Sequence, residues 1–168
     1  MLDFSPAAQR FTELAEMYQE DLLRVCFLYL QDQGLAEDAV QETFLKAYRA
    51  LPQYREECSP KTWLTRIAIN TCKDYRRTFW FRRVRWNEMP EWAVSHGPDV
   101  SEESIAVSVE IARLPPKLKE TVLLYYYQDM TVNEIAEALG ISQSSVSARL
   151  IRAREKLRAA LKGVYFHE

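Results

Sequence analysis

The chain has 168 residues, of which 48% are hydrophobic and 27% charged, as is usual for a soluble globular protein of one domain or two small ones. No apolar run approaches the roughly 18 residues that cross a bilayer, and the N-terminus lacks the basic start and apolar core of a signal peptide, so we expect a cytoplasmic protein. Three distant cysteines and two isolated histidines disfavour a disulfide framework and a zinc site, so we expect no metal, no cofactor and buried or idle thiols.

The net charge of −2 is unusual for a nucleic-acid binder, but the charge is unevenly distributed. Residues 73–85 hold six basic side chains against one acid, and residues 149–162 again hold six against one. Residues 91–110 hold five acids and no lysine or arginine. Two basic surfaces separated by an acidic connector are therefore predicted.

Three helices are predicted in the N-terminal half. Ser5 and Pro6 form a cap and first turn, and apolar residues continue at helical spacing as far as Gly34, where we expect the first helix to end. A second helix is predicted from about Ala36 to Pro52, and a third from Ser59 after a loop over residues 52–59. On the second helix, the face opposite the apolar stripe carries Asp38, Gln41, Glu42, Leu45 and Arg49.

The outer side of the third helix is polar and cationic. Its residues stand at positions i, i+4, i+7 and i+11 and form a single row, namely Arg66, Asn70, Lys73 and Arg77. Residues 78–86 then alternate aromatic rings with arginines. Such a stretch can hold single-stranded nucleic acid by stacking and charge, but it can also be plain core or lie on a membrane surface.

Residues 87–104, rich in acids, proline and glycine, predict a linker. A helix is predicted from Ile105 to Ala112, with a break at Leu114-Pro115-Pro116 and a further helix through Leu118, Val122 and Tyr125. No strand pattern of useful length appears. The predicted fold is all-α, with two small helical domains, residues 1–86 and 105–168, joined by a flexible acidic linker.

A helix-turn-helix is predicted near the C-terminus. Thr131 and Glu134 form a capping box, Gly140 permits a sharp turn, and Ser142 can cap a second helix. On that helix Val146, Leu150, Ala153 and Leu157 form the inward stripe. The pattern is typical of a DNA-reading device, although an ordinary helical hairpin has the same local signals.

The outward side of the second helix combines small residues with cations. Small residues near its start would let it approach bases, and cations further along would meet phosphates. Ser144, Ala148, Ile151 and Arg152 lie opposite the apolar stripe, flanked by Ser145, Ser147, Arg149, Arg154 and Arg158.

Four segments together resemble bacterial RNA polymerase sigma factors of the extracytoplasmic-function (ECF) type, and they span nearly the whole chain. They are Ala36-Glu-Asp-Ala-Val-Gln-Glu-Thr-Phe-Leu-Lys-Ala-Tyr-Arg49, Trp63-Leu-Thr-Arg-Ile-Ala-Ile-Asn70, Leu114-Pro-Pro-Lys-Leu-Lys-Glu120 and Ile151-Arg-Ala-Arg-Glu-Lys-Leu157. The resemblance implies an alternative sigma factor that binds core RNA polymerase, at the clamp coiled coil of the largest subunit and at the flap, and recognises promoter DNA. No small-molecule substrate is expected. An anti-sigma factor, frequently membrane-anchored in this family, would hold the protein inactive, in the cytoplasm or at the inner membrane surface.

The resemblance also implies which residues act. The polymerase contacts would be Asp38, Gln41, Glu42 and Leu45. The loop over residues 52–59 would capture a flipped base of the minus-10 element, and the contacts to that element would come from Tyr54, Arg55, Arg66, Asn70, Lys73, Arg76 and Arg77. The minus-35 element would be read by Ser144, Ser145, Ser147, Ala148, Arg149, Ile151 and Arg152. Because Ala148 is apolar and many relatives have a cation where this chain has Ser147, contact with a thymine methyl group is favoured over a bidentate grip on guanine.

Two other classes of function remain as hypotheses. A free-standing helix-turn-helix regulator would bind duplex DNA tightly without polymerase, ordinarily as a dimer on a palindrome. An enzyme is disfavoured, because the two histidines are isolated, the four glycines form no phosphate-cradling loop, and no catalytic or metal-ligand grouping is present.

Overall fold

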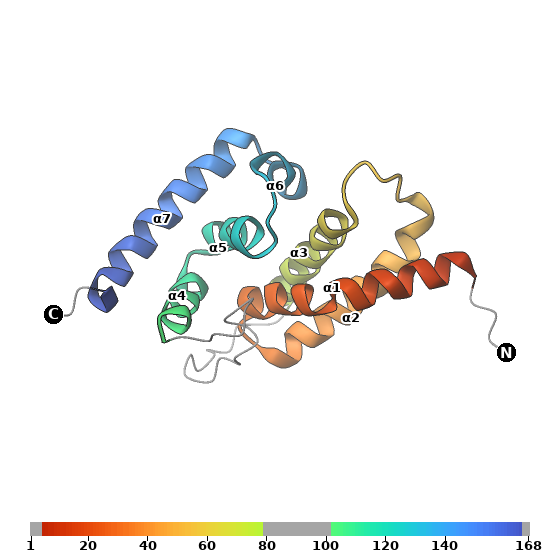
Figure 1. The fold of residues 1–168 in the computed structure, drawn as a ribbon, viewed down its shortest axis with the longest axis horizontal. Helices are drawn as coiled ribbons and strands as arrows, with labels where there is room; N and C mark the ends of the chain where they lie inside the picture. Colours follow the sequence, from red (N-terminus) through yellow and green to blue (C-terminus); the bar gives the residue numbers. More distant parts are fainter. Residues whose placement is uncertain (1–4, 79–101, 166–168) are drawn as a thin grey trace. The chain divides into compact units, whose positions relative to one another are not determined.

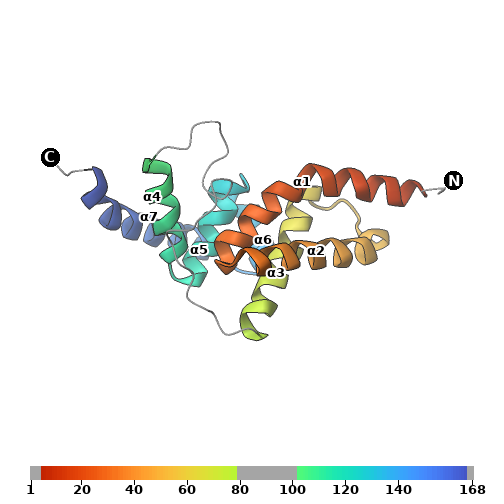
Figure 2. The same ribbon diagram turned by 90° about the horizontal axis from the view of Figure 1, so that it is seen from below.

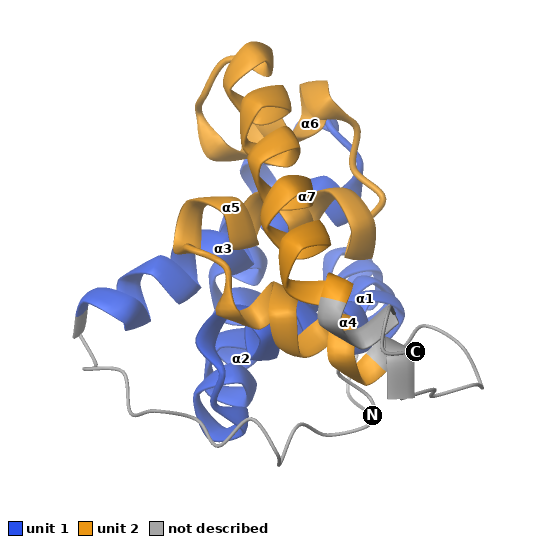
Figure 3. Cartoon of the chain, turned by 90° about the vertical axis from the view of Figure 1, so that its left-hand side faces the viewer, with its two compact units in different colours: residues 1–80 blue, residues 81–168 orange. Residues whose placement is uncertain are grey.

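The computed structural model describes residues 5–78 and 102–165, and within these ranges every regular element is a helix. The chain divides into two compact units, Met1–Trp80 and Phe81–Glu168, which are coloured separately in Figure 3. The predicted all-α class with two small helical domains is confirmed. Most of the linker predicted at residues 87–104 lies outside the described residues.

Unit 1 is a three-helix bundle of α1 (Pro6–Leu30), α2 (Gln33–Ala50) and α3 (Pro60–Thr78), with a short 3-10 helix, η1 (Leu51–Gln53), after α2. Each of the three helices packs against the other two, and α1 and α2 run side by side in both Figure 1 and Figure 2. The buried face of α2 is made of small residues, which let α1 and α3 approach closely: Ala36, Ala39, Val40, Thr43 and Ala47.

The boundary between the first two helices differs from the sequence prediction. The first helix ends at Leu30 and not at Gly34, because Gln31 takes a left-handed conformation (φ 60°) and its N–H bonds the Phe27 carbonyl. The Asp32 carboxylate then caps α2 by accepting from the N–H of Leu35 at 2.9 Å. Gly34 therefore lies in the first turn of α2, so the predicted end at Gly34 was wrong.

Two of the three thiols of unit 1 are packing groups, as expected, and the third, Cys58, is half-buried in the loop before α3. Cys26 on α1 and Cys72 on α3 are both fully buried and neither is in a disulfide. A hydrogen bond with Cys26, together with burial, raises the pKa of the Cys72 thiol. Because the thiolate is the reactive form, the burial and the raised pKa both disfavour reaction at the Cys72 thiol.

Unit 2 contains α4 (Glu102–Arg113), α5 (Pro116–Val122), the π-helix η4 (Leu123–Tyr127), α6 (Val132–Leu139) and α7 (Gln143–Tyr165). The long helix α7 packs against α4, α5 and α6, with α6 near its N-terminal end in Figure 1. The break between α4 and α5 falls at Leu114 and Pro115, as predicted, whereas the π-helix was not foreseen. Among residues 5–78 and 102–165, no helix has the length and apolar character required to span a membrane.

Candidate nucleic-acid interfaces

The turn between α6 and α7 has the local structure that the sequence predicted. The Thr131 hydroxyl accepts from the Glu134 N–H at 3.2 Å, and the Glu134 carboxylate accepts from the Thr131 N–H at 2.8 Å. Gly140 has φ 66° and ψ 37°, which a residue with a side chain adopts only at a cost. The Ser142 hydroxyl then accepts from the Ser145 N–H at 3.1 Å and caps α7. A helix-turn-helix is confirmed.

The first turns of α7 present a small, polar surface. Val146, Leu150 and Ala153 are buried, which confirms the inward stripe. Of the residues predicted to read the minus-35 element, Ala148 and Arg149 are half-buried, and the others are exposed: Ser144, Ser145, Ser147, Ile151 and Arg152. The three serines form a face with little bulk close to the helix start, as entry into a major groove requires, and the larger Ile151 and Arg152 follow one to two turns later.

Arg149 is placed differently from the exposed cations of α7. Its side chain is 17% exposed, and Nη1 lies 3.3 Å from Oε1 of Glu120, whose side chain on α5 is 6% exposed. Removing one member of a buried ion pair is costly, so this contact ties the position of α7 to that of α5. The structure therefore directs Arg149 toward the interior of unit 2.

The outward face of α2 carries the residues that were predicted to contact polymerase. Asp38 and Gln41 are exposed, and Leu45 is 59% exposed although it is apolar. Glu42 is half-buried, because its carboxylate accepts from the Tyr75 hydroxyl at 2.8 Å. Burial and this bond raise the pKa of Tyr75, so the phenol remains a donor.

Glu42 also belongs to a polar network that joins α2 to α3. Nζ of Lys46 lies 3.5 Å from Oε1 of Glu42 and 3.8 Å from Oδ2 of Asp74, and it donates to the Thr71 hydroxyl at 3.1 Å. The carboxylate of Glu42 is therefore held in a fixed orientation at the edge of the exposed α2 face.

The cationic row of α3 is present on its surface. Arg66, Asn70 and Arg77 are exposed and Lys73 is half-buried. Arg76 lies away from the row, with its guanidinium 5.8 Å from the centre of the Tyr29 ring on α1. The residues predicted to contact the minus-10 element thus separate into an outward row and one side chain that packs on α1.

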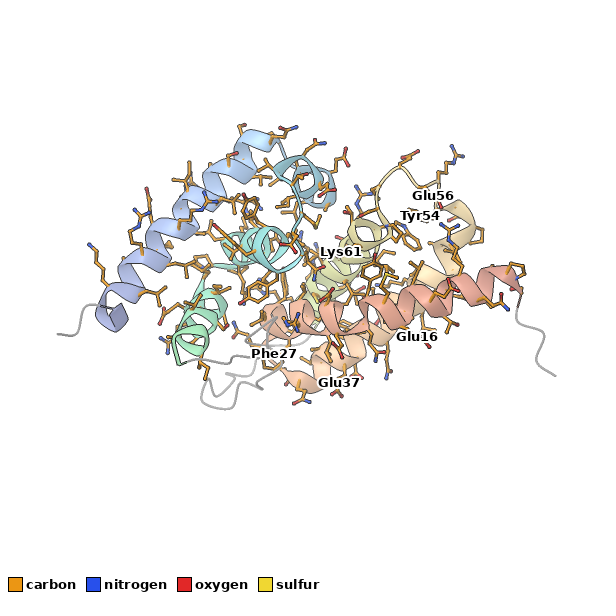
Figure 4. The ribbon with its side chains drawn as sticks, viewed as in Figure 1. Glu16, Phe27, Glu37, Tyr54, Glu56 and Lys61 are labelled. Atoms are coloured by element: carbon orange, nitrogen blue, oxygen red, sulfur yellow. The ribbon has the colours of Figure 1, made fainter. Side chains whose placement is uncertain are left out.

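The loop between η1 and α3 forms an open hollow with a volume of about 340 Å³. This volume is within the range of roughly 300–1,000 Å³ that is usual for pockets that hold small ligands. Figure 4 shows Tyr54 and Glu56 on this loop. The hollow brings together three residues predicted to contact the minus-10 element, three more from the predicted base-capturing loop over residues 52–59, and Trp63. Its lining is Gln53, Tyr54, Arg55, Glu57, Cys58, Trp63 and Arg66.

Tertiary contacts hold the loop in this shape. The Tyr54 and Trp63 rings stack, with centroids 4.5 Å apart and planes 18° from parallel. The Tyr54 hydroxyl donates to the Cys58 carbonyl, and burial is the main cause of the raised pKa of Tyr54. Glu56 has φ 58°, an uncommon conformation for a residue with a side chain, and pairs with Arg10 of α1. The hollow therefore depends on residues distant in sequence.

Trp63 is the functional candidate that sequence reasoning missed. It entered the sequence argument only as part of a segment resembling a family, although its ring forms the wall against which Tyr54 stacks. Residues 79–86, with their alternating aromatic rings and arginines, lie outside the described residues, so the three interpretations of that stretch stay predictions. Within the described part of the chain, no cluster of His, Cys, Asp and Glu is grouped to hold a metal ion.

Two family models match the chain. Sigma-70 region 2 matches residues 14–82, which include α2, the hollow and the α3 row, and sigma-70 region 4 matches residues 104–157, which include the helix-turn-helix. The two matches in this order, on a three-helix unit and a helix-turn-helix unit, identify the class as that of sigma-70 transcription initiation factors.

Individual relatives show which kind of sigma-70 factor the chain resembles. The chain is 31% identical to the ECF RNA polymerase sigma-E factor of Haemophilus influenzae, over 88% of this chain and 85% of that protein. Its fold is similar to that of the sigma factor RpoE from Bartonella quintana, solved in complex with the anti-sigma factor NepR (TM-score 0.77, 19% identity, 92% of this chain and 98% of that one). It is also similar to CnrH, solved in complex with the cytosolic domain of CnrY (TM-score 0.70, 26% identity, 92% and 90%).

The chain belongs to the extracytoplasmic-function sigma factors. It is an alternative sigma factor that directs promoter-specific transcription initiation, and the resemblance found in the sequence is confirmed.

Proposed function

We propose that unit 1 binds the clamp coiled coil of the largest polymerase subunit through α2. Support comes from Leu45, an apolar side chain left 59% exposed between polar neighbours on a helix whose opposite face is buried. An apolar centre with carboxylates at its margin suits a basic partner surface with an apolar centre. The contacts would be Asp38, Gln41, Glu42 and Leu45, with Glu42 oriented by Tyr75 and Lys46.

We infer that the hollow beside α3 receives an unstacked base of the minus-10 element. A base needs an aromatic or planar surface for stacking and polar groups for its edge, and the hollow has the stacked Tyr54–Trp63 pair and Arg55. The row of Arg66, Asn70, Lys73 and Arg77 would follow the phosphates of the separated strand, with Arg76 anchoring α3 to α1. This composition is the observation that carries the proposal.

The first turns of α7 would read the minus-35 element in the major groove. Small side chains leave room for α7 to approach the bases closely at Ser144, Ser145, Ser147 and Ala148. The methyl group of Ala148 suits a thymine methyl, and Ile151 would add an apolar contact. Arg152 is exposed and would meet a phosphate. Arg149 would act at this interface by fixing α7 on α5, because its guanidinium pairs with Glu120.

The domains would be residues 1–86 for the minus-10 and clamp contacts and residues 105–168 for the minus-35 element and the flap, with residues 87–104 as the linker. We propose that the protein acts by binding alone, with no catalytic turnover, cofactor or small-molecule substrate. An anti-sigma factor is a further proposed partner, because CnrH, 26% identical, was solved with the cytosolic domain of CnrY. The site of action would be the cytoplasm, where core polymerase works, or the inner membrane surface when an anti-sigma factor anchored there holds the protein.

A transcription assay tests the proposal directly. Core polymerase with the purified chain would be given a randomised promoter library, and we expect the recovered transcripts to share two sequence blocks at a fixed spacing. Recovery without a shared block, or duplex binding that is equally tight without polymerase, would favour the free-standing regulator.

The α2 contact has its own matched control. Leu45→Arg is expected to weaken binding to core polymerase at least tenfold, because it puts a cation on a surface proposed to face a basic partner. Met17→Arg makes the same change at an apolar side chain on α1 that is 66% exposed, and we expect it to have little effect. Equal loss in both variants would mean that the polymerase surface extends over α1.

A further inference from the structure

Arg154 on α7 is an exposed cation held in one orientation by aromatic side chains. Its Nε donates to the Tyr126 hydroxyl at 2.8 Å, and its guanidinium carbon lies 5.7 Å from the centre of the Tyr125 ring and 5.8 Å from that of Tyr126. Within the described residues Arg154 makes no ion pair, whereas Arg149 pairs with Glu120.

Tyr126, which contacts Arg154, lies where the chain leaves α-helical geometry. Residues 123–127 form the π-helix η4, in which the N–H of Gln128 bonds the Leu123 carbonyl at 3.2 Å. The wider turn leaves Tyr126 46% exposed, while Leu123 and Leu124 are buried. Single π-turns are uncommon, but those that occur are often found at functional sites. This location favours a functional role for the Tyr126 phenol.

Arg154 lies further along the face of α7 that begins at the groove-reading residues. Ser147, Ile151 and Arg154 stand at i, i+4 and i+7 and share one stripe. With a rise of 1.5 Å per residue, Arg154 lies about 10 Å beyond Ser147 along the axis and about 15 Å beyond Ser144. The major groove is about 12 Å wide, so a residue at this distance from the reading end reaches the phosphates at the groove edge.

We propose that Arg154 is a phosphate-binding residue at the edge of the groove entered by α7, and that Tyr126 is its positioning residue. This inference rests on the proposed reading of the minus-35 element by α7. With Nε occupied by the phenol, the two terminal nitrogens are left to donate to phosphate oxygens. Because the side chain is already ordered by Tyr125 and Tyr126, less rotamer freedom is lost on binding.

The test uses holoenzyme, reconstituted from core polymerase and the full chain, on a promoter duplex recovered from the randomised library. Binding would be measured over a range of NaCl concentrations to obtain the slope of log Kobs against log[NaCl]. Arg154→Ala is expected to reduce the magnitude of the slope by about 0.9, the value for one lost phosphate contact. Tyr126→Phe is expected to weaken binding roughly threefold at constant salt and to change the slope less, because the charge remains. Arg154→Lys should likewise keep the slope and lose affinity.

Arg113→Ala is the matched control, since it removes an exposed arginine of unit 2 from α4 and should leave the slope unchanged. An unchanged slope for Arg154→Ala, with a lowered melting temperature, would overturn the inference and make the tyrosine contact structural. If the wild-type chain selects no promoter at all, the proposed function itself fails and the inference fails with it.

Discussion

The helix-turn-helix of unit 2 and the hollow of unit 1 reach their shapes by different means. In the helix-turn-helix, the capping contacts join residues three apart, as in Thr131 with Glu134 and Ser142 with Ser145. The hollow depends on the stacking of Tyr54 on Trp63. It also depends on the ion pair between Arg10 and Glu56, two residues that are 46 positions apart in the sequence. The turn that leads into the proposed duplex-reading helix is thus specified locally, whereas the candidate base pocket is specified by packing between elements.

Because the two surfaces are held differently, they should be sensitive to substitutions at different places in the chain. A change in α1 can alter the hollow without touching it, because α1 holds the loop through Arg10. The helix-turn-helix also depends on distant residues at the pair of Glu120 and Arg149, because there a buried carboxylate on α5 holds α7. Variants at Arg10 and at Arg149 therefore test whether the two surfaces depend on distant residues in these ways.

The largest expected effect is at Arg149. Arg149→Met should destabilise unit 2 by about 3 kcal/mol, because the largely buried carboxylate of Glu120 would lose its ion pair with the Arg149 guanidinium. Adding Glu120→Leu should recover most of the loss, since two apolar side chains can replace such a pair. Hydrogen exchange of the α5 and α7 amides measures unit 2 alone. A loss below about 0.5 kcal/mol, combined with a reduced salt slope in DNA binding, would return Arg149 to the set of direct DNA contacts.

A pair of glycine variants compares the turns of the two units. Gly140→Ala should cost about 1 kcal/mol, because φ is +66° although a Cβ there would meet no atom within 4 Å. Gly34→Ala should stabilise unit 1 by about 0.5 kcal/mol, because alanine has a higher helix propensity than glycine and residue 34 is helical. The added Cβ would fit, since its nearest neighbour, an oxygen of the Asp32 carboxylate, would lie 3.4 Å away. Thermal unfolding by circular dichroism separates the outcomes; destabilisation by both variants would contradict the assigned end of α1.

The smallest effect on stability is expected at Arg10. Arg10→Ala should cost about 0.5 kcal/mol or less, since both partners of the pair with Glu56 are at least half exposed. Promoter opening should nevertheless fall severalfold, because the loop loses its tie to α1. Gln9→Ala, the neighbouring exposed position, is the control and should leave opening unchanged. Normal opening in Arg10→Ala would show that the hollow does not depend on α1.

Much of the fold could be predicted from sequence because periodicity and caps are local. The capping box at Thr131, the turn at Gly140 and the buried stripe of α7 all follow from residues within one or two turns of each other. The end of α1 was missed because Gln31, not a glycine, adopts the left-handed cap, and nothing in the spacing of apolar residues marks that choice.

The candidate sites were predicted less completely, because helical spacing shows which residues share a face of a helix but not which residues of other elements pack against that face. It placed Arg149 on the flank of α7 but could not show that Glu120 lies beside it. It placed Trp63 one turn before Arg66 on α3 but could not show that the Tyr54 ring of the preceding loop stacks on it. Such information depends on which helices pack together, and only the tertiary structure supplies it.

The division of labour between the units is tested most directly by permanganate reactivity of the minus-10 thymines, measured with the upstream duplex footprint on the same promoter. We expect Trp63→Ala to keep the footprint and to lose at least nine-tenths of the reactivity, because Tyr54 loses the ring that shapes the hollow. Arg152→Ala should weaken the footprint and leave the reactivity of the bound fraction near that of the wild type. If both variants reduce both signals in proportion, the two surfaces do not act separately and the account is contradicted.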